Sequence, residues 1–331
     1  MSKNTKSNIS TGTKIARFIL SKNELGAVIP LIGLCVIVAF VNPRFFSVEN
    51  FLDILRTTSF TVLIGVALTF LMTAGGMDLS VGSTLSMAGV VAAYCSRIGL
   101  PLILCIVIAL IAGGLVGAFN GFAIVKMGQP PFITTMAVDY IVKGAIVLAT
   151  GGDTVTGVTQ TFKTMGQYLI FDIIPIPIVY GVVVVVVGFI IMNKTKLGRA
   201  VAAIGGNPET AHLAGINVTK VRFFIFVVVS MSAAQCGVVY AGRFSSGMVS
   251  AGDGYNLKIM GAVIIGGTSW KGGNGTIAGT VLGCLLMAVI TNFLVMCGVN
   301  TQAQQLIFGI ILVIAIFIDK WRRSILSGGL G

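Results

Sequence analysis

Ionisable side chains inside apolar sequence are the first residues of this chain that could do chemistry. Asp78 lies in AGGMDLSVGS (residues 74–83), between two apolar stretches, where a carboxylate costs about 2.5–3.5 kcal/mol to insert at membrane depth. It either belongs to a solute or proton pathway or, with Ser80, caps a helix that restarts after a break. Asp139 and Lys143 are four residues apart, which predicts an i,i+4 ion pair rather than a proton relay.

The other reactive side chains form no recognisable site. His212 is the single histidine, and the cysteines form no CxxC pair, so we expect them to act as small apolar residues in helix packing. The chain has no HExxH motif, no GxxxxGK[ST] loop and no paired carboxylates. We therefore expect no catalytic residue, no metal site and no cofactor in this chain. The six cysteines are Cys35, Cys95, Cys105, Cys236, Cys284 and Cys297.

The elements that must position these residues are apolar helices. Of 331 residues, 56% are hydrophobic and only 10% are charged, with a mean hydropathy of +1.00. Such a composition excludes a soluble enzyme and predicts an all-α polytopic membrane protein with about ten transmembrane helices, several of them short or broken by glycine. The apolar runs are 25–41, 58–73, 83–96, 100–125, 132–150, 173–192, 221–241, 256–267, 276–295 and 302–318.

The net charge of +12 could indicate a nucleic-acid partner, but its placement follows the membrane topology. With the N-terminus inside and the runs alternating, most basic residues fall on the cytoplasmic side, as the positive-inside rule requires. Both termini are then cytoplasmic, and no nucleic-acid partner is expected. Seven of the 22 basic residues fall on the other side: Arg44, Arg56, Arg97, Lys143, Lys163, Arg243 and Lys258.

The predicted organisation is a single membrane domain between two short tails. Residues 1–24 and 320–331 are expected to be cytoplasmic tails, and residues 25–319 the permeation domain. After Val41 comes Asn-Pro-Arg-Phe-Phe, which offers no cleavage site, so the first apolar run is read as an uncleaved span. Residues 47–56 predict a short capped helix in the outer interface.

Two glycine-interrupted segments, residues 74–83 and 265–274, indicate a translocation path. Aligning Gly75-Gly76 with Gly266-Gly267 suggests an internal repeat, and paired broken segments in two halves of a transporter mark its pathway. We expect that pathway to carry few charges and to be lined by small residues. Gly188, by contrast, is expected in an ordinary lipid-facing run. The predicted pathway residues are Gly76, Asp78, Ser80, Ser83, Gly267, Ser269 and Asn274.

Residues 194–222 form a polar, basic excursion in this apolar chain. Within it, Asn207 is a preferred N-cap, Pro208 suits the first helical position, Glu209 suits the first turn, and Gly215 is a stop signal. A short capped helix on the face of a membrane protein predicts a cytoplasmic docking element for a partner. Since the chain has no nucleotide site of its own, that partner could be an ATPase.

Three segments resemble a known family. Glu209-Thr210-Ala211 followed by Gly215 resembles the E-A-A-x-x-x-G loop of ABC importer permeases, with threonine in place of the first alanine. More specifically, GGMDLSVGS (75–83), LGRAVAAIGGNPETAHLAGINV (197–218) and GGTSWKGGNGTIAGT (266–280) resemble the permeases of ribose-type monosaccharide ABC importers, and the likeness extends over residues 42–319.

The resemblance implies a multi-pass permease in the bacterial inner membrane, paired with a second permease chain that is a copy or a sibling. It further implies two sugar-importer ATPase subunits, which would bind ATP and magnesium, and an extracytoplasmic sugar-binding protein. The same superfamily carries nucleosides, branched-chain amino acids and a furanosyl signal. Carried over by position, the coupling residues would be Gly206, Asn207, Pro208, Glu209, Ala211 and Gly215.

Two other classes of transporter stay open from the residues alone. An ion-coupled secondary transporter would use Asp78 and Asp139 as coupling sites. A passive channel would need neither carboxylate. Both classes leave the capped helix of the polar segment without a function, so we favour the ATPase-driven importer.

Overall fold

A computed structural model describes residues 25–326 of the chain. Residues 1–24 and 327–331 lie outside the described part, so the predicted N-terminal tail and the last residues of the predicted C-terminal tail are not seen. The C-terminal tail predicted from residue 320 begins as helix, because the last helix, α14 (Thr301–Leu326), continues past that point.

Almost every described element is a helix, in agreement with the predicted all-α class. The exception is a two-stranded antiparallel hairpin, β1 (Leu169–Ile170) with β2 (Ile174–Pro175). The helices are α2 (Leu25–Val41), the 3-10 turn η1 (Pro43–Phe46), α3 (Val48–Thr73), α4 (Val81–Arg97), α5 (Leu102–Gly121), the π turn η2 (Phe122–Lys126), α6 (Pro131–Thr150), α7 (Gln160–Gln167), α8 (Ile176–Lys194), α9 (Lys196–Gly206), α10 (Pro208–Leu213), α11 (Val218–Phe244), α12 (Tyr255–Ile265), α13 (Ile277–Met296) and α14.

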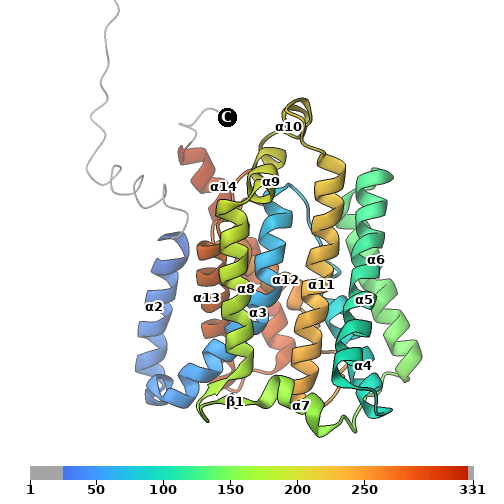
Figure 1. The fold of residues 1–331 in the computed structure, drawn as a ribbon. Coiled ribbons are helices and arrows are strands. Elements are labelled where there is room, and N and C mark those ends of the chain that lie inside the picture. Colours follow the sequence, from blue (N-terminus) through green and yellow to red (C-terminus); the bar gives the residue numbers. More distant parts are fainter. Residues whose placement is uncertain (1–24, 327–331) are drawn as a thin grey trace, which may run out of the picture.

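The long helices run up and down side by side, with short elements at the two ends of the bundle (Figure 1). The short helices α9 and α10 lie at one end, and α7 with the β1–β2 hairpin lies at the other. Each predicted apolar run is found as a helix. Among the described residues, six helices are long and apolar enough to cross a membrane, namely α3, α5 with η2, α6, α8, α11 and α13, while α4 and α12 are shorter. The predicted number of about ten spans is therefore not confirmed.

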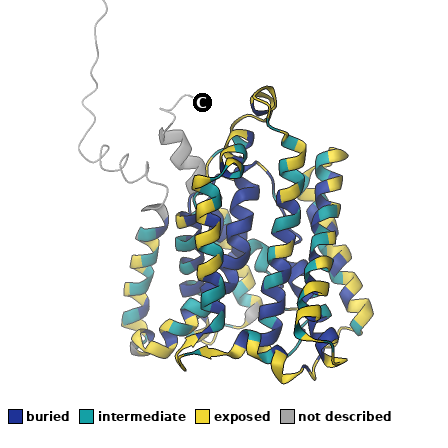
Figure 2. Cartoon of the chain, in the orientation of Figure 1, coloured by how far each residue is buried: buried dark blue, intermediate teal, exposed yellow. Residues whose placement is uncertain are grey.

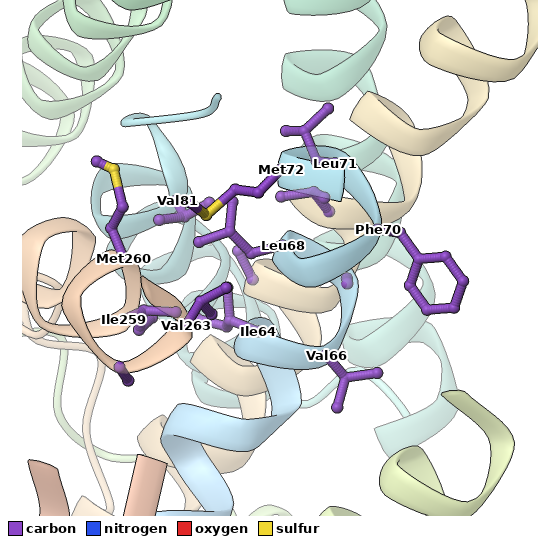
Figure 3. Close-up of a cluster of buried hydrophobic side chains, with 14 of the residues drawn as sticks. Ile64, Val66, Leu68, Phe70, Leu71, Met72, Val81, Ile259, Met260 and Val263 are labelled. Carbon is purple, nitrogen blue, oxygen red and sulfur yellow. The ribbon is translucent and has the colours of Figure 1, made fainter. Parts of the chain in front are cut away.

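Helix α3 is the centre of the bundle. Its residues from Thr58 to Thr73 are buried on every side, as expected of a helix that is apolar all round. Figure 3 shows Ile64 and Leu68 directed toward Ile259 and Val263 of α12, whereas Phe70 points to the opposite side. The short helix α12 therefore lies inside the bundle, and its eleven residues do not reach both ends.

Helices α5, α6 and α8 form apolar outer walls (Figure 2). In an apolar stretch of 18 residues in each, only 22%, 22% and 17% of the residues are buried, and the exposed side chains are largely valine, isoleucine and leucine. An apolar exterior of this extent is suited to lipid rather than to water. Gly188 of α8 corrects one expectation: it is buried, and a Cβ there would collide with Val66 of α3.

The outer helix predicted for residues 47–56 forms the start of α3. Ser47 is its N-cap and accepts a hydrogen bond from the Asn50 amide at 3.2 Å, so the predicted helix start is confirmed. The helix then continues through Gly65 to Thr73 without interruption, because the apolar sequence that follows contains no proline to break it.

Candidate functional site

Helix α10 has the capped form that the sequence predicts. The Asn207 side chain accepts hydrogen bonds from the amides of Glu209 and Thr210, at 2.9 and 3.0 Å, and Pro208 occupies the first helical position. Gly215 ends the element with a φ of +83°. These contacts fix a six-residue helix at the tip of the bundle (Figure 1).

The two faces of α10 differ in what they can contact. Ala211 is only 3% exposed and packs on the hydrophobic core of the chain itself, so it is the residue that seats α10 on the bundle. Glu209 and His212 are exposed, and Leu213 is 82% exposed. The outward face therefore presents an acidic, a basic and an apolar side chain. Sequence reasoning missed Leu213, although a leucine in so polar a segment was a usable signal.

Helix α9, directly before α10, touches both glycine-interrupted segments. A Cβ on Gly205 would collide with the Thr73 carbonyl oxygen and the Gly273 amide nitrogen, so only glycine permits this approach. The neighbouring Gly206 is exposed, with open space around it. The backbone at the end of α9 is thus in direct contact with the end of α3 and with the loop that follows α12.

Helix α11, directly after α10, is tied to the first interrupted segment by a second contact. The Arg222 guanidinium donates two hydrogen bonds to the Ala74 carbonyl, from Nε at 3.2 Å and from Nη2 at 2.9 Å. That carbonyl is one of the unsatisfied groups at the C-terminus of α3, where a cation is also favoured by the helix dipole. Sequence reasoning placed Arg222 only as a cytoplasmic charge and did not find this contact.

The two interrupted segments end their helices in the same way, but in a different register from the predicted alignment. At the end of α3, Gly75 has a φ of +76° and the Gly76 amide bonds the Leu71 carbonyl; at the end of α12, Gly267 has a φ of +92° and the Thr268 amide bonds the Val263 carbonyl. Gly75 therefore corresponds to Gly267, one residue away from the alignment predicted above.

The motif itself does not establish an internal repeat, since α4 and α13 end in the same motif at Gly99 and Gly298. What distinguishes the two interrupted segments is that they touch. The Gly273 amide donates to the Thr73 carbonyl at 2.9 Å. A Cβ on Gly272 would also lie only 3.0 Å from the Gly75 backbone.

Asp78 is enclosed in a hydrogen-bond network where α4 begins. Its Oδ1 accepts from the Ser80 amide at 2.8 Å and from the Ser80 hydroxyl at 2.6 Å, and Asn120 of α5 donates to both carboxylate oxygens at 3.4 Å. Ser230 of α11 donates to Oδ2 at 3.5 Å. As predicted, Asp78 accepts an amide hydrogen bond where the helix restarts, but the amide is that of the N-cap residue Ser80 and not one of the first helical turn. The partners Asn120 and Ser230 were not predicted.

The predicted ion pair between Asp139 and Lys143 is wrong. Asp139 accepts a hydrogen bond from the Ser83 amide at 3.2 Å, so its carboxylate lies at the N-terminus of α4, where a negative charge is favoured. Lys143 pairs with Asp253, in the loop before α12, instead. Asp139 and Lys143 share one helical face, but each side chain binds a partner from another segment.

The predicted pathway residues are mostly enclosed by protein. Asp78, Ser80, Ser83 and Ser269 are buried, and Gly76 and Gly267 belong to the helix ends described above. Asn274 is exposed, and its carbonyl accepts from the Ser269 amide at 2.8 Å. Their role as lining of a pathway stays a prediction.

A cavity of about 490 Å³ opens at the end of the bundle opposite α10; we call it the outer cavity. It lies between the start of α3, the end of α11, the loop before α12 and the start of α14. Charged side chains line it, in contrast to the expected weakly charged pathway, and none of the predicted pathway residues does. Its charged residues are Asp53, Arg56, Arg243, Asp253 and Lys258.

A second cavity, of about 730 Å³, adjoins α10 and is lined by Lys126, His212, Lys220 and Phe223 among others. The end of the bundle that carries α10 therefore offers both a protruding helix and a basic recess. Within residues 25–326, no cluster of three or more His, Cys, Asp or Glu side chains could hold a metal ion.

Comparison with known proteins gives consistent matches. A family model described as "branched-chain amino acid transport system / permease component" matches residues 50–316. The chain is 35% identical to a ribose import permease of Haemophilus influenzae, over 97% of this chain and 98% of that protein. It is 33% identical to a fructose import permease of Rhizobium meliloti, over 90% and 86%, and 32% identical to a galactose/methyl galactoside import permease of Haemophilus influenzae, over 92% and 96%. No solved structure matches it significantly.

Proposed function

The chain belongs to the family of branched-chain amino acid transport system permease components, and from that premise we propose that it is the membrane subunit of an ATP-driven importer of a small sugar. Its relatives named for import of ribose, fructose and galactose support a sugar as the substrate. A ribose-like monosaccharide is the first candidate. The chain is a multi-pass membrane protein, and the bacterial inner membrane is the proposed location.

The observation that carries the proposal is the position of α10 between two contacts with the interrupted segments. On one side Gly205 of α9 touches Thr73 and Gly273, and on the other Arg222 of α11 binds Ala74. A partner that moves α10 would therefore move the ends of α3 and α12 through backbone contacts. In this proposal α10 docks on a partner ATPase, and the remaining coupling residues hold its shape.

ATP binding and hydrolysis then belong to the partner subunits, which would also hold magnesium. Closure of two ATPase subunits would displace the α10 helices of two permease chains, and the helices attached to them would rock between outward-facing and inward-facing states. An extracytoplasmic binding protein would deliver the sugar. The residues Gly76, Asp78, Ser80, Ser83, Gly267, Ser269 and Asn274 would lie beside the moving segments.

The rival function is an ion-coupled transporter. Its two coupling candidates, Asp78 and Asp139, each accept hydrogen bonds that fix the start of α4. This structural task supports reading both carboxylates as caps, and it leaves α10 unexplained under the rival function.

The test uses α10. Glu209→Lys reverses a helix N-terminal charge that is worth about 0.3–1 kcal/mol locally and places a cation on the docking face. We expect the partner ATPase to stop co-purifying with the chain and ATP-driven uptake to fail, while the chain still inserts. Asp153→Lys makes the same change on the exposed loop at the opposite end and should leave ATPase co-purification intact. If Glu209→Lys combined with Asn207→Ala retains the ATPase and uptake, α10 is not the coupling element.

A further inference from the structure

The outer cavity gathers charges that the topology does not explain. Seven basic residues fall outside the positive-inside pattern, and three of them, Arg56, Arg243 and Lys258, line this one cavity. A fourth, Lys143, pairs with Asp253 on its wall. Basic residues at this end are disfavoured by topology, so their concentration here indicates a task at the cavity.

The charges of the cavity do not cancel. Asp53 pairs with Arg56, and Asp253 pairs with Lys143. Among the side chains that the structure describes, no carboxylate lies within ion-pair distance of Arg243 or Lys258. Arg243 also lies close enough to Arg56 for their like charges to interact. The walls thus hold two cations whose counter-charges are not supplied by the described protein.

Lys258 is the informative one, because it lies at the bottom of the cavity and is only 4% exposed. Its ammonium lies 5.3 Å from the ring centre of Tyr255 and 5.5 Å from that of Phe308. Aromatic faces attract a cation but do not neutralise it. A buried ammonium is costly unless a charged partner accompanies it, so an anion in the cavity would stabilise Lys258.

The remaining lining suits a small polyol. Tyr240, Tyr255 and Phe60 form edge-to-face ring contacts that present apolar surfaces. Gln304 and Gln305 contribute amide groups at the same wall. Flat aromatic faces with a few polar groups are the usual lining of a small-molecule site, and a volume of about 490 Å³ is ample for one monosaccharide.

We propose that the outer cavity is a selectivity site for sugars with an anionic substituent, a carboxylate or a phosphate, whose charge is taken by Lys258 with Arg243 at the rim. This inference rests on the proposed function, because a sugar importer is what makes the cavity the receiving site on the far side from the ATPase. It narrows the substrate from any small sugar to an acidic one. The specificity of transport then lies partly in the permease itself and not only in its binding protein.

The experiment measures binding to the full chain in lipid nanodiscs by saturation-transfer difference NMR, with D-ribose, D-ribonate and D-ribose 5-phosphate as probes. We expect D-ribonate or D-ribose 5-phosphate, or both, to bind about tenfold or more tightly than D-ribose, since hydrogen bonds between charged groups are the strong ones. Which anionic probe wins distinguishes carboxylate from phosphate recognition.

Variants test whether Lys258 carries the preference. Lys258→Met keeps the length and apolar character of the side chain and should abolish the preference for the anionic probes, while Lys258→Arg should keep it. Lys271→Met removes the same charge from an exposed loop at the α10 end and should change nothing. Arg243→Gln, at the half-buried rim, is the second variant and should weaken the preference even if Lys258→Met does not fold.

Two results would overturn the inference. One is equal binding of D-ribose and the anionic probes by the unaltered chain. The other is an anionic preference that survives in Arg243→Gln and in Lys258→Met. Failure of the proposed function looks different, because the assembled complex would then import no sugar on addition of ATP. A complex that imports D-ribose and ignores both anionic sugars contradicts only the selectivity site.

Discussion

The amide of Gly273 donates a hydrogen bond to the carbonyl of Thr73 at 2.9 Å, which joins the loop after α12 to the end of α3. Gly205 of α9 touches both partners of this bond. Three segments that are far apart in the sequence therefore meet at one point beneath the coupling helix. Because the contacts are between backbone atoms, they leave little room for independent movement.

The first prediction tests that meeting point. Gly205→Ala places a Cβ against the Thr73 carbonyl and should cost about 1–3 kcal/mol of stability or displace α9 from the interrupted segments. ATP-driven uptake should be lost. Gly206→Ala, one residue further on, meets open space and should leave thermal unfolding unchanged. Similar behaviour of the two variants would remove the close contact from the coupling mechanism.

The second prediction concerns Arg222. Arg222→Ala removes two hydrogen bonds to the Ala74 carbonyl and leaves that carbonyl without its cation, so the free energy of unfolding should fall by about 1.5–3 kcal/mol. Lys220→Ala, on the exposed side of the same helix start, should change it by less than about 0.5 kcal/mol. Unfolding of both variants in detergent, followed by circular dichroism, is the measurement. Equal stabilities would mean that the Ala74 contact contributes nothing.

The third prediction separates the two readings of Asp78. Asp78→Asn keeps an oxygen that can accept from the Ser80 amide and should leave uptake independent of a proton gradient. Asp78→Ala removes the acceptor from a buried network and should destabilise the chain by about 1–3 kcal/mol for each donor left unpaired. The measurement is uptake into vesicles with and without an uncoupler, which shows whether transport depends on a proton gradient. Gradient-driven uptake that disappears in Asp78→Asn would favour the ion-coupled transporter.

The fourth prediction concerns the left-handed glycines. Gly75→Ala and Gly267→Ala force an L side chain into positive φ and should each cost about 1–2 kcal/mol. Gly76→Ala should be milder, since its Cβ would meet chiefly the flexible end of the Leu71 side chain. Gly144→Ala, in open space on the exposed side of α6, is the control and should be neutral or slightly stabilising. Gly188 is unsuitable as a control because it is buried against Val66. Thermal unfolding of the four variants ranks them, and a Gly76 variant as unstable as the Gly75 variant would contradict the register.

The sequence by itself determined the membrane class, the position of each apolar helix and the capped helix α10. Apolar runs and caps are local properties: Asn207, Pro208 and Gly215 act on amides within a few residues of themselves, so their effect can be read without knowing the rest of the fold. The helix start at Ser47 was predicted for the same reason. The length of that helix was not predicted, because the sequence has no stop signal near Arg56.

Only the tertiary structure decided which residues meet. Asp139 and Lys143 share a helical face, yet each found a stronger partner from another segment, the Ser83 amide and Asp253. Arg222, Asn120 and Gly205 act through contacts with residues distant in the sequence, which no spacing within the chain predicts. The outer cavity is likewise formed by the ends of separate helices. In the sequence, its basic residues are separate exceptions to the positive-inside rule, and only the packing of the helices places them in one cavity. Side-chain chemistry and the spacing of nearby residues can be read from the sequence. Proximity between distant residues arises only when the apolar helices are buried against one another and their packing is set.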